Sequence, residues 1–132
     1  MLKVIVLSLI FLPLNSLQSD ELAFRLFSDF VKFSSSVDAY SQVCVRGFDS
    51  LKAQEELFDL VSTLRQNIKL SENQFSELKD KYSRIAISTQ SQLKQLGLNR
   101  NKNLCKKYLK IFERFDKKKN EKLLEIVEVI DG

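Results

Sequence analysis

The residues best suited to chemistry in this sequence are two cysteines, Cys44 and Cys105, and a dense group of lysines toward the carboxyl end. The chain has no histidine, which removes the base of Ser-His-Asp and Cys-His catalytic groups. Two cysteines alone do not complete a tetrahedral zinc site, and the sequence has no glycine-rich phosphate loop. We therefore predict that the protein is not an enzyme and has no metal or other cofactor.

The basic side chains are concentrated between residues 94 and 122. This segment holds 11 lysines and arginines against three acidic residues, a net charge of +8. On a helical wheel, one half of the segment carries Lys102, Lys106, Lys107, Lys110, Arg114, Lys117 and Lys118. The other half is apolar, which is the pattern of a basic amphipathic helix. Such a face is either the solvated side of a bundle helix or a binding surface for a polyanion or an anionic membrane.

Phenylalanine recurs at every third position in FRLFSDFVKF, residues 24–33. A step of three residues turns a helical side chain back by about 60°, so these rings spiral over a wide arc. An outer bundle helix needs an apolar arc of a little over about 100°, which Phe30 and Phe33 already serve as core residues. The surplus apolar side chains are Phe24, Phe27 and Val31. We expect the C-terminal segment, a hydrophobic ligand or a protein partner to cover them.

The first 19 residues have the layout of a secretory signal peptide: Lys3, an apolar run over residues 4–14, and a polar exit that ends at Ser19. The run is shorter than the roughly 20 residues that a membrane span needs. Pro13 argues against the alternative of a buried N-terminal helix, because proline disrupts helices. We therefore predict cleavage near Ser19, a single domain over residues 20–132, and a secreted location, which in a bacterium would be the periplasm.

Scarce helix breakers and the spacing of apolar residues predict helices. Proline occurs only at Pro13, and the chain has three glycines. Apolar steps of three and four residues predict four helices, at about 21–46, 50–68, 72–96 and from 102 onward. Ser71 and Gln74 have the spacing of a capping box that starts the third helix, and Gly97 is the predicted stop.

Three stretches of these helices need separate interpretation. Lys119 lies within DKKKN, residues 116–120, and Lys122 lies just beyond it. Both fall on the apolar side of the fourth helix. The helix therefore either breaks there or turns these long side chains out to water. The final apolar stretch, residues 123–130, is expected to be helical because the sequence offers no other strand to pair with it. The serines at 34–36 are expected to be an exposed part of the first helix rather than a nucleophile.

Short connections make successive helices antiparallel, so the predicted fold class is an all-α, up-down-up-down four-helix bundle. Cys44 then lies at the end of the first helix and Cys105 at the start of the fourth, at the same end of the bundle. An exported protein passes through an oxidising compartment. We therefore predict one disulfide that joins helices one and four.

These patterns favour a secreted, non-enzymatic helical protein that binds a macromolecule or an anionic surface. The alternative is a small extracellular carrier that holds a hydrophobic ligand, such as a fatty acid, between its helices. A carrier would need an internal cavity of roughly a few hundred Å³ lined with phenylalanine and leucine. Nucleic acid is not expected as a partner of an exported protein, and no transmembrane anchor is expected after signal cleavage.

Overall fold

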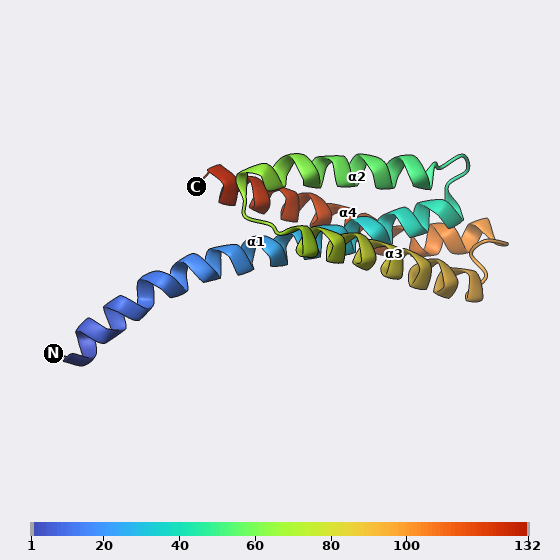
Figure 1. Ribbon diagram of the computed structural model, residues 1–132. Helices are drawn as coiled ribbons and strands as arrows, with labels where there is room; N and C mark the ends of the chain where they lie inside the picture. The colour runs from blue at the N-terminus through green and yellow to red at the C-terminus, as the bar shows by residue number, and fades with distance from the viewer. Residues whose placement is uncertain (1, 132) are drawn as a thin grey trace.

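The computed structural model describes the backbone of residues 2–131 and the side chains of residues 21–131. Within this part of the chain, the structure has four α-helices, a short 3-10 helix and no strand. The elements are α1 (Leu2–Cys44), α2 (Ser50–Leu64), η1 (Arg65–Asn67), α3 (Glu72–Gln95) and α4 (Lys102–Asp131). Successive α-helices reverse direction along the bundle (Figure 1). The predicted all-α four-helix fold is confirmed.

The first helix begins much earlier than predicted. It starts at Leu2 rather than near residue 21, so it runs through Pro13 and through the predicted signal segment, residues 1–19. Proline removes one backbone hydrogen bond, and the leucine-rich apolar run around it is otherwise favourable for a helix. In Figure 1 this N-terminal part of α1 projects beyond the other helices. Its side chains lie outside the described ones, so the signal peptide stays a prediction.

No helix within residues 2–131 has an apolar stretch long enough to cross a lipid bilayer.

Local sequence signals set both ends of α3. The Ser71 hydroxyl accepts a hydrogen bond from the Gln74 amide at 3.1 Å, and the Gln74 side chain accepts one from the Ser71 amide at 3.0 Å. This is the predicted capping box. At the other end Gly97 has a φ of 92°, and the Leu98 amide donates to the Leu93 carbonyl at 3.0 Å. The chain therefore closes the last turn with the predicted glycine and returns Leu98 to the core.

The fourth helix is continuous through residues 116–120. From sequence, either a break or a continuous helix was expected at this point. Lys119 forms a salt bridge with Asp116 at 2.8 Å, and Lys122 forms one with Glu125 at 3.4 Å. Both pairs are three residues apart on the helix, a spacing that brings side chains together. The two lysines therefore stay partly buried on the apolar side without interrupting α4.

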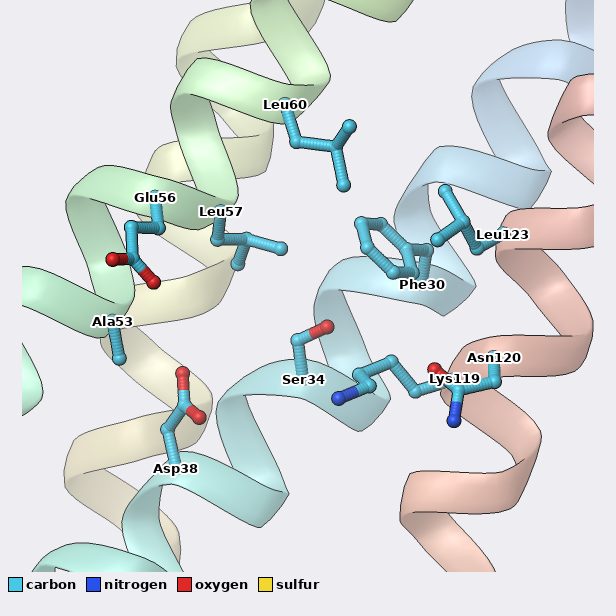
Figure 2. A pocket seen from close by; sticks show the side chains of 10 residues that line it. All are labelled: Phe30, Ser34, Asp38, Ala53, Glu56, Leu57, Leu60, Lys119, Asn120 and Leu123. Atoms are coloured by element: carbon cyan, nitrogen blue, oxygen red, sulfur yellow. The ribbon is translucent and has the colours of Figure 1, made fainter. Parts of the chain in front are cut away.

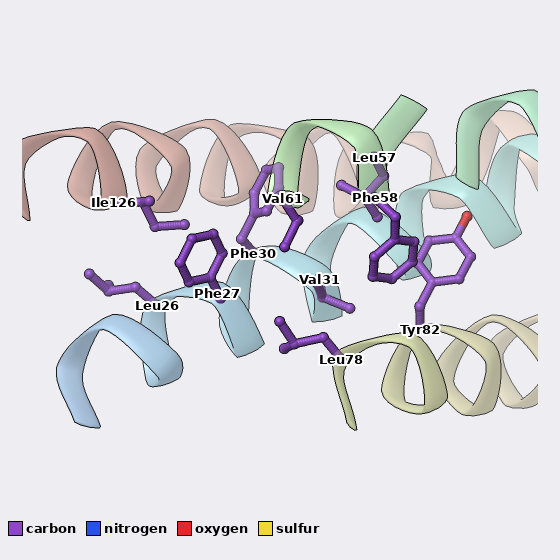
Figure 3. Close-up of a cluster of buried hydrophobic side chains, with 10 residues drawn as sticks. All are labelled: Leu26, Phe27, Phe30, Val31, Leu57, Phe58, Val61, Leu78, Tyr82 and Ile126. Atoms are coloured by element: carbon purple, nitrogen blue, oxygen red, sulfur yellow. The ribbon is translucent and has the colours of Figure 1, made fainter. Parts of the chain in front are cut away.

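The core consists of two clusters of buried side chains along α1. The main cluster takes residues from all four α-helices: Leu26, Phe27, Phe30, Val31, Leu57, Phe58, Val61, Leu78, Tyr82 and Ile126 (Figure 3). The disulfide-end cluster has none from α2: Tyr40, Leu93, Leu98 and Phe112. The buried side chains of α2 are Leu57, Phe58 and Val61, all in the second half of that helix. The first half of α2 therefore lies over the bundle without a buried anchor.

Cys44 and Cys105 form the predicted disulfide, with their Cα atoms 5.7 Å apart. One turn before Cys44, the Tyr40 hydroxyl donates a hydrogen bond to the Cys105 carbonyl at 2.6 Å. The Tyr40 ring also stacks on Phe112, with ring centroids 4.5 Å apart. Three different interactions therefore join the end of α1 to the start of α4.

Candidate functional site

All seven basic side chains singled out on α4 are exposed on its outer surface. This basic face consists of Lys102, Lys106, Lys107, Lys110, Arg114, Lys117 and Lys118. Within residues 21–131, no salt bridge involves any of them. At 1.5 Å per residue the face extends about 24 Å along the helix. Residues 102–118 hold seven basic and two acidic side chains, so this surface has a net charge of +5.

Part of the opposite side of α4 packs into the core. Phe112 is 7% exposed in the disulfide-end cluster, and Ile126 is 0% exposed in the main cluster. The helix therefore presents charge outward and packs part of its apolar side into the core, while its apolar residues Leu109, Ile111, Leu124 and Val127 are exposed.

A hollow of about 480 Å³ beside the disulfide adds to the positive surface. Its lining includes Arg46, Arg100 and Lys102 and no carboxylate. Because Lys102 belongs to the basic face as well, the cationic surface continues from α4 over this end of the bundle.

The surplus apolar residues of α1 are mostly buried. Phe27 and Val31 are fully buried in the main cluster, and Phe24 is half-buried and packs against it. Ile126, from the C-terminal stretch of α4, belongs to the same cluster. The C-terminal segment therefore shares in covering this cluster with α2 and α3, and Phe24 lines a hollow with Leu78 and Lys81 of α3. No surface of Phe27 or Val31 is left for a ligand or partner to contact in this structure.

Phe33 was expected to be core, and this expectation was wrong. The side chain is half-buried, with its ring centroid 5.8 Å from that of Phe115. The wide apolar arc of α1 allowed several rings to face inward, and Phe27 rather than Phe33 lies in the main cluster with residues of α2, α3 and α4.

A cleft of about 300 Å³ lies between α1, α2 and α4 (Figure 2). One side of its lining is apolar and consists of Phe30, Leu57, Leu60 and Leu123. The polar side chains that line it are Ser34, Asp38, Glu56, Lys119 and Asn120. The cleft is therefore amphipathic rather than the uniformly apolar cavity that a fatty-acid carrier needs.

Two of the three serines at 34–36 are buried, contrary to the expectation that this stretch would be exposed, and Ser36 is partly exposed. Ser34 is 3% exposed and Ser35 is fully buried, because α1 is flanked by three other helices and buries more than one stripe. The Ser35 hydroxyl donates to the Lys32 carbonyl at 3.0 Å. The Ser34 hydroxyl has no hydrogen-bond partner within residues 21–131, and Figure 2 shows it pointing into the cleft.

Asp38 is half-buried one turn beyond Ser34 on the same face of α1. The Tyr82 hydroxyl donates a hydrogen bond to Asp38 Oδ2 at 2.6 Å. Burial raises the pKa of Asp38, while the bond from Tyr82 and the charge of Lys119 oppose that rise. Burial and the bond to Asp38 raise the pKa of Tyr82, so its hydroxyl remains a donor at neutral pH. No salt bridge within residues 21–131 involves Asp38.

Sequence reasoning singled out the basic face but missed the cleft. One signal was present, since Lys119 fell on the apolar side of the fourth helix. The spacing of Ser34 and Asp38, four residues apart, also places them on one face of a helix. Neither signal could show that α2 covers that face.

Two regions thus hold charged groups that form no salt bridge within residues 21–131: the basic face of α4, which can attract anions, and the cleft with Asp38 and Glu56, which can enclose a small polar ligand. The chain matches no protein-family model, and no curated protein and no solved structure matches it significantly.

Proposed function

We propose that this protein is exported and acts without catalysis, by binding an anionic surface through the basic face of α4. The observation that carries the proposal is the row of seven exposed cations over about 24 Å of helix, none in a salt bridge within residues 21–131. Each lysine or arginine that lies near an anionic bilayer contributes about 1 kcal/mol of attraction. Several such residues on one face together bind the bilayer firmly, although the attraction of each one is weak.

The packing of α4 favours contact by charge rather than by insertion. An amphipathic helix that enters a bilayer buries its apolar side among the lipids. In α4 that side holds Phe112 and Ile126 in the two core clusters, and the disulfide ties the start of the helix to α1. The basic face would therefore bind acidic headgroups from outside, and added salt would weaken this binding by screening.

The disulfide supports export, because such bonds persist mainly in oxidising compartments. The layout of residues 1–19 gives the same indication from sequence.

The carrier alternative has weaker support. Phe27 and Val31 are packed by protein side chains, and the cleft between α1, α2 and α4 has Ser34, Asp38 and Lys119 in its lining. A fatty-acid chain placed there would strip water from charged groups without replacing their hydrogen bonds.

Sedimentation with lipid vesicles tests the proposal. The protein is expected to bind phosphatidylcholine vesicles that contain phosphatidylserine, to bind pure phosphatidylcholine poorly, and to be released by salt. Changing Lys106, Lys107, Lys110 and Arg114 to glutamine should weaken binding by about a hundredfold or more.

A matched control removes the same number of charges elsewhere. Lys52, Lys69, Arg84 and Lys94 are exposed, lie outside α4 and form no salt bridge within residues 21–131. Their change to glutamine should reduce binding only slightly. Equal binding by the two variants would refute the proposal, and binding to sulfated-polysaccharide beads but not to vesicles would assign the surface to a polymer rather than to lipid.

A further inference from the structure

The lining of the cleft between α1, α2 and α4 includes none of the seven residues of the basic face, and it contains a buried polar group without a hydrogen-bond partner within residues 21–131. Ser34 is 3% exposed, its hydroxyl has no partner within residues 21–131, and it points into the cleft (Figure 2). Buried hydroxyls are nearly always hydrogen-bonded, because an unsatisfied one destabilises the folded state. A ligand that accepts or donates a hydrogen bond at this point would remove that cost.

The charges around the cleft favour a cation. Asp38 from α1 and Glu56 from α2 lie on the side of the cleft away from α4 (Figure 2). Neither carboxylate forms a salt bridge within residues 21–131. The only cation in the lining is Lys119, and its ammonium group is already paired with Asp116 at 2.8 Å. Half-buried Asp38, which accepts a hydrogen bond from Tyr82, and exposed Glu56 are therefore both without a salt-bridge partner within residues 21–131.

The remaining wall fits a short hydrocarbon group. Phe30 from α1, Leu57 and Leu60 from α2, and Leu123 from α4 converge on one side of the cleft (Figure 2). The volume of about 300 Å³ is at the small end of the range for ligand pockets. The occupant must therefore be small, with one polar end and one apolar end.

We propose that this cleft binds a small organic cation, namely a primary ammonium group on a short apolar body. The ammonium group lies between Asp38 and Glu56 and donates to the Ser34 hydroxyl, since its three N–H donors can serve three acceptors. The apolar body packs against Phe30 and Leu60.

An NMR titration of the purified protein with 3-methylbutylamine tests the assignment. Saturable shifts are expected at the amides of Ser34, Asp38 and Leu60. The alcohol of the same shape, 3-methylbutan-1-ol, should bind at least about tenfold more weakly because it carries no charge.

Two substitutions should weaken amine binding without unfolding the protein. Asp38→Asn keeps the shape of the side chain and an acceptor for Tyr82, and it should lower the affinity about tenfold. Ser34→Ala should lower the affinity about fivefold while the melting temperature stays the same or rises, because the hydroxyl has no hydrogen-bond partner within residues 21–131 to lose. Asp59→Asn, an exposed carboxylate elsewhere on α2, is the control and should bind as wild type.

A third substitution gives an effect of the opposite sign. Lys119→Gln removes the positive charge from the lining and should tighten amine binding, which a general loss of folding cannot do. The proposal is overturned if no amine produces saturable shifts in the cleft, or if the alcohol binds as tightly as the amine. Tighter binding of leucine, which adds a carboxylate to the same body, would also overturn the assignment to a cation.

Discussion

The basic face of α4 is exposed to water, whereas the cleft between α1, α2 and α4 is partly enclosed. Both hold charged side chains that form no salt bridge within residues 21–131. On the basic face seven cations are exposed to water along a helix whose other side lies partly in the core. In the cleft Asp38 is half-buried, and the Ser34 hydroxyl is almost completely enclosed. Exposed charges cost little to leave unpaired, and salt screens them. Enclosed polar groups cost more, and they discriminate better between ligands.

The difference follows from how the helices are held. The disulfide, the Tyr40 hydrogen bond and the Tyr40–Phe112 stack join α1 to α4 at the end where the basic face begins. In contrast, the buried side chains of α2 lie only at Leu57, Phe58 and Val61. A cleft can therefore form along the lightly anchored helix, while the rigid pair presents the charged surface.

Removal of the disulfide should have the largest effect on stability. It acts at the end of the bundle where the basic face begins. The bond closes a loop of 61 residues, so the Cys44→Ser, Cys105→Ser double variant should lose about 4 kcal/mol of unfolding free energy by loop-closure entropy. Denaturant unfolding under non-reducing conditions measures this loss. Reductant should bring the wild type to the same midpoint and leave the variant unchanged. An unaltered midpoint in the variant would contradict the importance of the covalent link.

A cavity created in the main cluster, near the cleft, should have the next largest effect on stability. Ile126 is fully buried one turn beyond Leu123, which lines the cleft. Ile126→Ala should therefore cost about 3 kcal/mol in thermal unfolding and weaken amine binding, while the folded protein keeps its affinity for anionic vesicles.

The neighbouring residue supplies the control for that cavity. Val127 is 36% exposed, so Val127→Ala should change stability much less than Ile126→Ala. Similar losses for the two variants would show that the C-terminal segment does not pack as described.

Neutralising Asp38 should have the smallest effect on stability, and unlike the two changes above it should not destabilise the folded protein. Burial raises the pKa of Asp38 in the folded protein above its value in the unfolded chain, so the folded state holds this proton more tightly. The stability linked to the proton is full below the unfolded pKa and is lost as the pH rises through the folded pKa. Asp38→Asn should therefore be at least as stable as wild type at neutral pH and lack this part of the acidic pH dependence. A clear loss of stability at neutral pH would contradict this account.

The features that were predicted correctly from sequence depend on residues close together in the chain or on the antiparallel order of successive helices. Ser71 and Gln74 cap α3 because their spacing alone satisfies the first-turn amides, and Gly97 ends it because glycine tolerates positive φ. The disulfide followed from the antiparallel order of the helices, which places Cys44 and Cys105 at one end.

The features that sequence missed depend on which helix covers which side of α1. The apolar arc of α1 was wide enough to bury either Phe27 or Phe33, and the arrangement of the other three helices decides in favour of Phe27. Ser34 likewise reads as an exposed polar residue until a second helix encloses it. The predicted start of α1 near residue 21 followed from the signal-peptide layout of residues 1–19, whereas in the structure the helix continues through Pro13 and begins at Leu2.

The central claim is that the basic face of α4 is the surface that contacts an anionic partner. Lysine acetylation read by mass spectrometry tests it on the unaltered protein, free and bound to phosphatidylserine-containing vesicles. We predict that bound vesicles slow the modification of Lys106, Lys107 and Lys110. Modification of the exposed control lysines Lys52, Lys69 and Lys94 should stay unchanged. Equal protection of both groups, or protection of the control lysines alone, would contradict the claim.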